Sequence, residues 1–173
     1  MSRPQPLLRM PVGVVIERRK AASSWANFVW RPVAAFSGTP DTRPWTVLDQ
    51  NPEATTFYAG SAEVGLFASG TPFYRENLAS NQPSLWVVLR PTAVDPPFEV
   101  LAVTADPAEG EAFTQAGDDL VEAVAMPESI REAIEFFVKE HHVDSTFVKR
   151  KRDQADPEAL ARRAPKSKSG GDE

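Results

Sequence analysis

The chain has 173 residues, enough for one domain with a buried core, and it contains no cysteine, which excludes disulfides, thiolate catalysis and cysteine-bound metal clusters. Hydrophobic residues make up 42% and charged residues 25%, which is the composition of a folded globular protein. The net charge is −5, and because residues 1–20 and 149–173 are basic, the body between them is acidic and repels nucleic acid and anionic membranes.

The first predicted strand is the apolar run at residues 11–16, in which alternate valine and isoleucine side chains share one face. This run is too short to cross a membrane, and the charged residues after it make it a poor secretory signal. We therefore expect a cytoplasmic protein with no membrane segment. Further strands are predicted at residues 28–36, where Pro32 indicates an edge strand or a bulge, and at residues 45–48.

The middle of the chain continues this strand pattern. Residues 55–58 and 63–68 predict two strands joined by a hairpin, because Gly60 lies in the connection between them. Residues 85–89 are apolar on both faces and predict a central strand. Residues 98–103 are expected to pair with that strand in the antiparallel direction.

Helices are indicated by their start signals. An N-cap residue precedes a proline at three places, Thr71-Pro72, Asp106-Pro107 and Asp156-Pro157. Glu109 and Gly117 add a capping-box spacing and a C-terminal stop to the second start, which predicts a short helix over residues 107–116. A longer amphipathic helix is predicted over about 127–141, because apolar residues recur there at helical spacing.

The uneven mixture of strands and helices predicts an α+β fold. We expect a mainly antiparallel sheet, with a barrel-like form as one option, two or three short helices and the longer helix over about 127–141. Residues 1–10 are predicted to be a flexible N-terminus, residues 11–148 a single globular domain, and residues 149–173 a basic, largely disordered tail.

Candidate catalytic groups are few. The two histidines, His141 and His142, are adjacent at the end of the predicted long helix, so they are either part of a Ser–His triad or structural residues at the helix C-terminus. Adjacent helical side chains point about 100° apart and do not chelate a metal together, so no metal is expected. No phosphate-binding glycine motif occurs, and no cofactor is expected. Asp118-Asp119 is either a carboxylate pair or a turn.

The sharpest charge feature is a run of four cations after Phe147, formed by Lys149, Arg150, Lys151 and Arg152. Such a run binds RNA, an anionic cofactor or an acidic protein surface, or it is a solvated tail attracted to the acidic residues 106–144. The chain is also rich in aromatic residues. A ring left exposed beside Arg31 or Arg75 would anchor a protein partner.

Several short segments follow one another in a characteristic order along most of the chain. They are Val12-Gly13-Val14-Val15-Ile16-Glu17-Arg18-Arg19, Trp25, Trp30-Arg31-Pro32-Val33, Tyr74-Arg75-Glu76-Asn77-Leu78, Pro83 to Arg90, Asp119-Leu120-Val121-Glu122, Met126-Pro127, and His141-His142-Val143 to Arg152-Asp153. In this order and spacing, over about residues 11–153, the sequence resembles the proteobacterial DUF3305 family of proteins of unknown function.

The resemblance implies an accessory role. Members of that family are typically encoded beside genes for a molybdenum-dependent formate dehydrogenase, near a ferredoxin-like protein and a TorD-like chaperone. We therefore expect a non-catalytic protein, without a cofactor, that binds a subunit of this enzyme or its chaperone. The resemblance supplies no catalytic residues. The expected partner contacts are the family-matching positions predicted to be on the surface, namely Arg31, Arg75, Asn77, His142, Lys149, Arg150, Lys151 and Arg152.

Two other functions remain open at this point. The first is an enzyme that acts on a small molecule or a cofactor, with His142 or Asp119 as general base. The second is a nucleic-acid-binding regulator that works through residues 149–152. The sequence does not indicate an oligomeric state.

Overall fold

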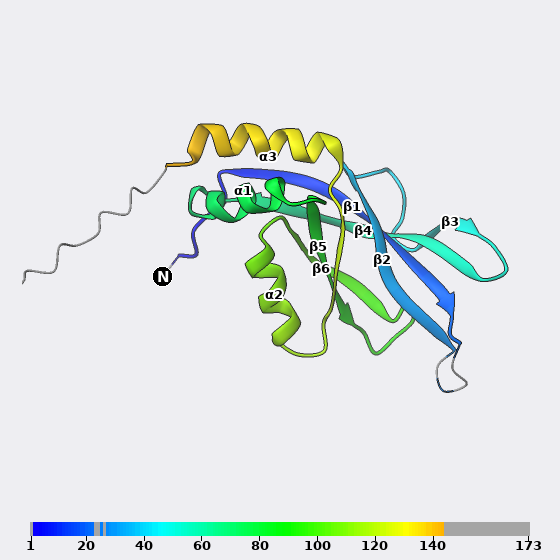
Figure 1. The fold of residues 1–173 in the computed structure, drawn as a ribbon. Helices are drawn as coiled ribbons and strands as arrows, with labels where there is room; N and C mark the ends of the chain where they lie inside the picture. The colour runs from blue at the N-terminus through cyan, green and yellow to red at the C-terminus, as the bar shows by residue number, and fades with distance from the viewer. Residues whose placement is uncertain (1, 23–24, 26, 144–173) are drawn as a thin grey trace, which may run out of the picture. The chain divides into compact units, whose positions relative to one another are not determined.

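The computed structural model describes residues 2–22, 25 and 27–143, and the chain divides into a compact unit of residues 1–142 and a second unit of residues 143–173. Within the described residues, seven strands form two antiparallel sheets, accompanied by three α-helices (Figure 1). This confirms the predicted α+β class and places the strands in two sheets rather than in one barrel-like sheet. No helix in this part of the chain is long and apolar enough to span a membrane.

The first sheet has four strands in the order β2–β1–β4–β3. Their bounds are β1 Leu8–Lys20, β2 Phe28–Ser37, β3 Thr46–Gln50 and β4 Ala54–Leu66. The edge strand β2 carries Pro32, and Val33 is an extra residue there because Val15 pairs with Ala34 and Ile16 with Pro32. Pro32 therefore lies both on an edge strand and beside a bulge, as its missing N–H donor requires.

The prediction of a hairpin around Gly60 was wrong, because β4 runs through this position without a turn. Gly60 has a φ of 129°, and the pairing with β1 shifts by one residue there, since Val14 pairs with Gly60 and Val15 with Tyr58. The glycine thus supplies the left-handed backbone conformation of a β-bulge. The sequence signal for a positive φ was correct, but it marked a bulge.

The second sheet has three strands in the order β6–β5–β7. Their bounds are β5 Ser84–Pro91, β6 Phe98–Thr104 and β7 Leu120–Ala125. The central position of β5 and its antiparallel pairing with β6 are confirmed. The strand β7 was not predicted, because its leucine, alanine and glutamate residues favour helices and only pairing with β5 makes it a strand.

The helical elements follow their start signals with one correction. Their bounds are η1 Ala68–Gly70, a 3₁₀ turn, then α1 Thr71–Ala79, α2 Pro107–Gln115 and α3 Glu128–His141. Asp106 caps α2 by accepting from the N–H groups of Ala108 and Glu109. Thr71 is the first residue of α1 rather than its cap, because η1 precedes it and Gly70 takes the cap position. The third start, Asp156-Pro157, lies outside the described residues.

One hydrophobic cluster joins the two sheets and the long helix. It contains Val12, Val14 and Ile16 of β1, Leu85, Val87 and Leu89 of β5, and Ile130, Ile134 and Phe137 of α3. Because β1 begins at Leu8, residues 8–10 belong to this strand rather than to the N-terminal segment assigned to residues 1–10. Met10 is buried there, opposite Val64.

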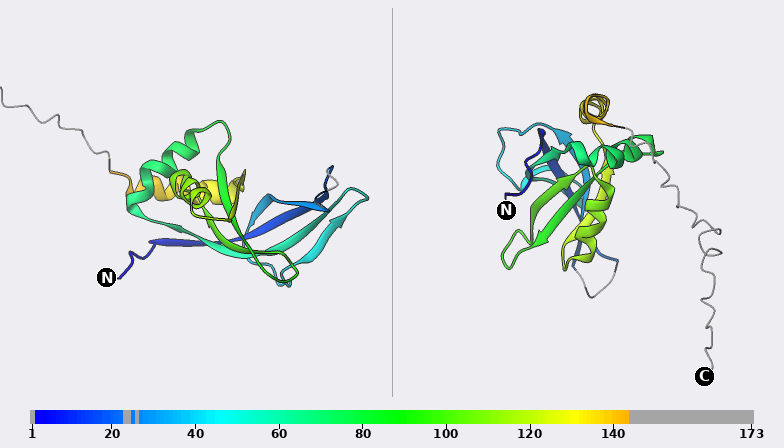
Figure 2. Two further views of the ribbon diagram at one scale, coloured as in Figure 1. Left: turned by 90° about the horizontal axis from the view of Figure 1, so that it is seen from below. Right: turned by 90° about the vertical axis from the view of Figure 1, so that its left-hand side faces the viewer.

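The helices are distributed unevenly along the first sheet (Figures 1 and 2). They gather near the N-terminal half of β1, where α1 and α3 contact each other. The C-terminal half of β1, the start of β2, and β3 with its turn into β4 project away from them. This second part, which we call the helix-free end, comprises residues 17–22, 25, 27–31 and 46–56.

Candidate functional site

The inward face of β1 changes character at the helix-free end. Val12, Val14 and Ile16 are completely buried, but the next two residues on the same face are Arg18 and Lys20. Arg18 is half-buried and Lys20 is exposed. The strand therefore continues beyond the apolar core with two cations on the face that is buried elsewhere.

Arg18 lies against aromatic rings. Its guanidinium carbon is 4.7 Å from the ring centre of Phe28, 5.3 Å from that of Phe57 and 5.6 Å from that of Trp30. These distances are typical of cation–π contacts. The Nε–H donor of Arg18 is buried, and no described residue accepts a hydrogen bond from it.

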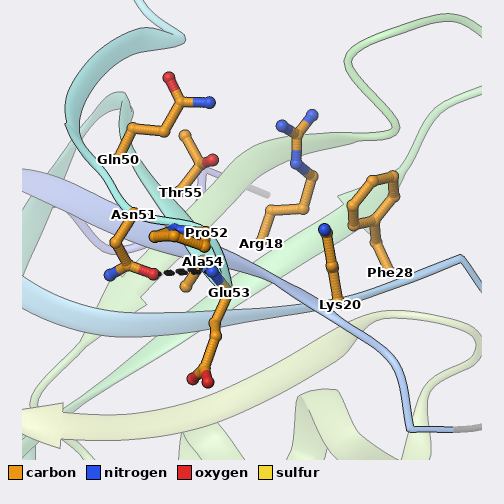
Figure 3. A pocket seen from close by; sticks show the side chains of 9 residues that line it. All are labelled: Arg18, Lys20, Phe28, Gln50, Asn51, Pro52, Glu53, Ala54 and Thr55. Carbon is orange, nitrogen blue, oxygen red and sulfur yellow. Dashed lines mark hydrogen bonds between the residues drawn. The ribbon is translucent and has the colours of Figure 1, made fainter.

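A pocket of about 320 Å³ opens beside Arg18 (Figure 3). Its lining residues come from β1, the start of β2, and the end of β3 with the following turn and the start of β4. They are Arg18, Lys20, Phe28, Gln50, Asn51, Pro52, Glu53, Ala54 and Thr55. Asn51 fixes the turn, because its Oδ1 accepts from the N–H groups of Glu53 and Ala54, both at 2.9 Å. We call this the Arg18 pocket.

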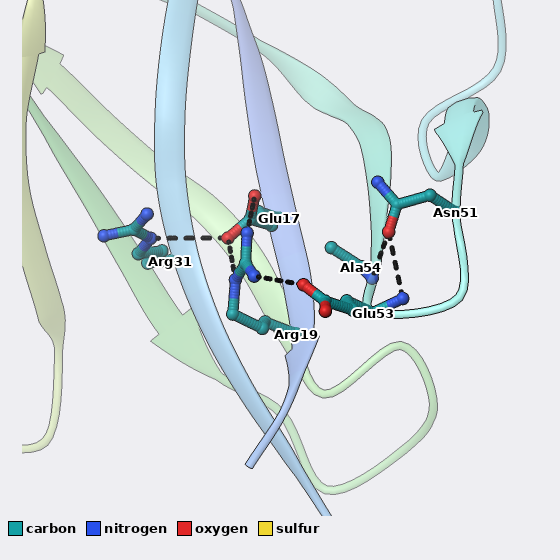
Figure 4. A network of polar contacts seen from close by, with 6 residues as sticks. All are labelled: Glu17, Arg19, Arg31, Asn51, Glu53 and Ala54. Carbon is teal, nitrogen blue, oxygen red and sulfur yellow. Dashed lines mark hydrogen bonds and ion pairs between the residues drawn. The ribbon is translucent and has the colours of Figure 1, made fainter. Parts of the chain in front are cut away.

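The opposite face of the same strands carries an ion-pair network (Figure 4). Arg19 donates to both carboxylate oxygens of Glu17, at 3.1 and 3.4 Å, and lies 3.5 Å from Glu53. The Nε atom of Arg31 on β2 is 3.6 Å from Glu17. The hydrogen bonds from Arg19 lower the pKa of Glu17 below its ordinary value, and Glu17 in turn raises the pKa of Arg19.

Apolar side chains are exposed on both faces of this end, Phe28 on the face of Arg18 and Val29 on the face of Arg31. Phe28 is 42% exposed and Val29 is 51% exposed at the start of β2, and Trp25 is 96% exposed in the connection before it. On the edge strand β3, Val47 and Leu48 are also exposed. The helix-free end thus combines aromatic and aliphatic surface with arginine and lysine side chains.

The structure separates the residues that were expected to contact a partner. Arg31 belongs to the helix-free end and is exposed, whereas Arg75 and His142 lie together at the junction of α1 and α3. Lys149, Arg150, Lys151 and Arg152 lie outside the described residues. The expected contacts therefore do not form one cluster in the described part of the chain.

Asn77 corrects the surface expectation, because it is only 3% exposed. Its Nδ2 donates to the carbonyls of Ser84 and Ala105 at 2.8 and 2.9 Å, and its Oδ1 accepts from the N–H of Ser84 at 3.0 Å. These bonds satisfy backbone groups where α1, β5 and the end of β6 meet. Asn77 therefore stabilises the fold and is not available to a partner.

His142 is held between two side chains. The Nη1 atom of Arg75 lies 3.1 Å from Nε2, and the Oγ1 atom of Thr71 lies 3.1 Å from Nδ1. Because a guanidinium only donates, Nε2 accepts, and the ring proton on Nδ1 is donated to Thr71. Thr71 in turn donates to the carbonyl of Ala68 at 2.9 Å. His142 thus links α3 to the start of α1.

The other candidate base, Asp119, is engaged in an ion pair. Its two carboxylate oxygens each accept from Arg90 at 3.3 Å, in a bidentate arrangement. In the described part of the chain, no three histidine, aspartate or glutamate side chains come together as metal ligands. The ring of His141 packs against that of Phe137 in a tilted arrangement, with the two ring centres 4.4 Å apart.

The Arg18 pocket was not found from the sequence, although a signal for it was present. The alternation that buries Val12, Val14 and Ile16 extends to Arg18 and Lys20, so it places two cations in the inward register of a strand. A charge in that register indicates either a buried partner or a strand that leaves the core. Only the position of the second sheet in the structure distinguishes these two alternatives.

The chain matches the model of a known protein family over most of its length. The model of DUF3305, described as "Protein of unknown function", matches residues 11–151. Searches of curated proteins and of solved structures each gave no significant match. Because the match covers most of the sequence, from β1 to beyond α3, the chain belongs to the DUF3305 family.

Proposed function

We propose that this chain is a non-catalytic, cytoplasmic accessory protein that binds another protein through its helix-free end. One observation carries the proposal: apolar side chains are exposed on both faces of β2 at its start, Phe28 on the face of Arg18 and Val29 on the face of Arg31. Exposed Trp25 is close to them in sequence. Aromatic residues and arginine are enriched at the centres of protein interfaces and provide most of their binding energy.

The proposed partner is a component of a molybdenum-dependent formate dehydrogenase or of its maturation machinery. The support for this part is the genomic neighbourhood that the family resemblance implies. An accessory protein for that enzyme needs a surface for a subunit or a chaperone, and the exposed aromatic and cationic side chains of the helix-free end support its assignment to this role.

The alternative functions have less support from the described residues. Asp119 is paired with Arg90, and His142 is hydrogen-bonded to Thr71 and Arg75. Each candidate base is therefore engaged in contacts within the fold. The nucleic-acid hypothesis depends on residues 149–152, which are outside the described residues.

Affinity purification of the tagged full chain, from cells producing formate dehydrogenase, tests the proposal. We expect the chain to recover a dehydrogenase subunit or a maturation factor. Val29→Asp should lower this recovery about tenfold or more by placing a charge in the interface centre. Val94→Asp is the matched control, since Val94 is 72% exposed in the loop between β5 and β6.

Two results would contradict the proposal. One is that the wild-type chain recovers neither a dehydrogenase subunit nor a maturation factor, while a deletion strain oxidises formate normally. The other is that Val29→Asp and Val94→Asp retain the partner equally, which would place the interface away from the helix-free end.

A further inference from the structure

Among the described residues, no carboxylate forms an ion pair with Arg18. Five other arginines each form an ion pair with a carboxylate: Arg9 with Glu63, Arg19 with Glu17, Arg31 with Glu17, Arg90 with Asp119 and Arg131 with Glu128. Arg18 is half-buried, and its Nε–H has no acceptor among the described residues. A partly desolvated cation of this kind interacts more strongly with an anion than a fully exposed one does.

The surroundings of Arg18 reinforce the positive charge. Lys20 is two residues further along the same face, and Figure 3 shows the two side chains next to each other, with the ring of Phe28 beside them. One carboxylate, that of Glu53, lines the pocket, but in this view it points away from both cations. Glu53 forms its ion pair with Arg19 in the network of the opposite face.

We infer that the Arg18 pocket receives an aspartate or glutamate side chain of the partner protein, an inference that rests on the function proposed above. A carboxylate matches the planar donor fork of arginine and gains a second contact from the lysine ammonium. Phe28 of β2 is exposed and lines the pocket, so a protein segment with an acidic residue beside an apolar one contacts both features. A free small anion would contact only the cations of the pocket and not the apolar surface beside them.

The preference of the pocket for a carboxylate is tested with two peptides whose ends are both blocked. One peptide contains a leucine and two adjacent glutamates, and in the other both glutamates are replaced by glutamines. Each is titrated into the ¹⁵N-labelled full chain, and the Nε–Hε resonance of Arg18 is followed. We expect saturable binding that is about tenfold tighter for the glutamate peptide. Arg18→Gln and Lys20→Gln should each weaken it, whereas Arg9→Gln, at the other end of β1, should not. Lys20 is exposed, so its variant leaves the fold intact.

Three results of this titration would overturn the inference. They are equal binding of the two peptides, undiminished binding by Arg18→Gln, and saturation by acetate or inorganic phosphate at the same concentration as by the glutamate peptide. The last would assign the pocket to a small anion.

Affinity purification with Arg18→Gln then separates this inference from the proposed function. If the wild-type chain recovers a partner and the variant recovers it about tenfold less, both stand. If the variant recovers the partner equally well, the inference fails while the proposed function stands. If acid-selective peptide binding is observed but no partner is recovered, the proposed function and the protein source of the carboxylate fail, and only the preference of the pocket for carboxylates remains.

Discussion

The two halves of β1 have the same strand geometry, but their inward faces carry different side chains and have different surroundings. In the N-terminal half, the inward side chains Val12, Val14 and Ile16 are completely buried against the second sheet and the helices. In the C-terminal half, the same face carries Arg18 and Lys20, and no described helix lies over it (Figure 2). The covered half contributes side chains to the hydrophobic core, whereas the helix-free end exposes charged and aromatic side chains.

This difference explains how one strand can be both a core element and part of the proposed binding surface. Burial of apolar side chains stabilises the covered half, and the backbone pairing it fixes extends into the helix-free end. The position of Arg18 is therefore set by β2 and β4, opposite Trp30 and Thr55, rather than by a partner. A rigid surface of this kind loses little conformational entropy on binding.

The largest expected effect is on the stability of the covered half. Ile16→Ala should lower the free energy of unfolding by about 2–5 kcal/mol, because it leaves a cavity in the core. Val47→Ala, on the exposed edge strand β3, should change it by less than about 0.5 kcal/mol. Chemical denaturation of both variants measures the two values, and similar values would remove the distinction between the halves.

A second comparison uses two asparagines that each accept hydrogen bonds from backbone N–H groups. Asn77→Ala should cost about 2–3 kcal/mol of folding free energy, because it leaves buried carbonyl and N–H groups of Ser84 and Ala105 without partners. Asn51→Ala, in the exposed turn before β4, should cost less than about 1 kcal/mol, since water replaces the lost acceptor. Urea denaturation showing equal costs would contradict the assignment of Asn77 to the fold.

The fold was predictable from the sequence where one pattern dominated. The alternation in β1, the apolar run in β5 and the helical spacing in α3 each identified an element correctly, since burial on one face or on both imposes these periods. The bulge at Gly60 and the strand β7 were not predictable in the same way. A positive φ occurs in turns and in bulges. The six residues of β7 include four that favour helices, and the strand forms by pairing with β5.

The candidate site was less predictable than the fold. Arg31 was correctly expected on the surface, but Asn77 was not, because a polar side chain gives no sequence signal for the backbone groups it will satisfy. The Arg18 pocket combines β1, β2 and the turn before β4. Its composition depends on strand pairing and on where the second sheet ends, and neither is encoded in a local motif.

Arg18 itself is expected to contribute little to the stability of the fold. Arg18→Met should change the free energy of unfolding by less than about 1 kcal/mol, because the lost cation–π contacts are offset by removal of the unsatisfied Nε–H. Arg90→Met should cost about 1–2 kcal/mol, since it leaves the mostly buried carboxylate of Asp119 without its partner. Thermal unfolding compares the two. A larger loss for Arg18→Met would mean that Arg18 serves the fold.

The smallest expected effect is the pH dependence of the network around Glu17. Hydrogen bonds from Arg19 lower the pKa of Glu17 in the folded state, so its stabilising contribution is present above the unfolded pKa and is lost as the pH falls through the folded one. Glu17→Gln should cost about 0.5 kcal/mol at neutral pH, a difference that disappears in acid. Denaturation at pH 7 and pH 3 measures this change, and a constant difference would contradict it.

Hydrogen exchange of the complex with the recovered partner tests the division of the molecule most directly. We expect binding to slow exchange at the backbone amides of residues 18–20 and 28–31 and to leave exchange in α1 and α3 unchanged. Slowed exchange confined to α1 and α3, with the helix-free end as accessible as in the free chain, would contradict this expectation.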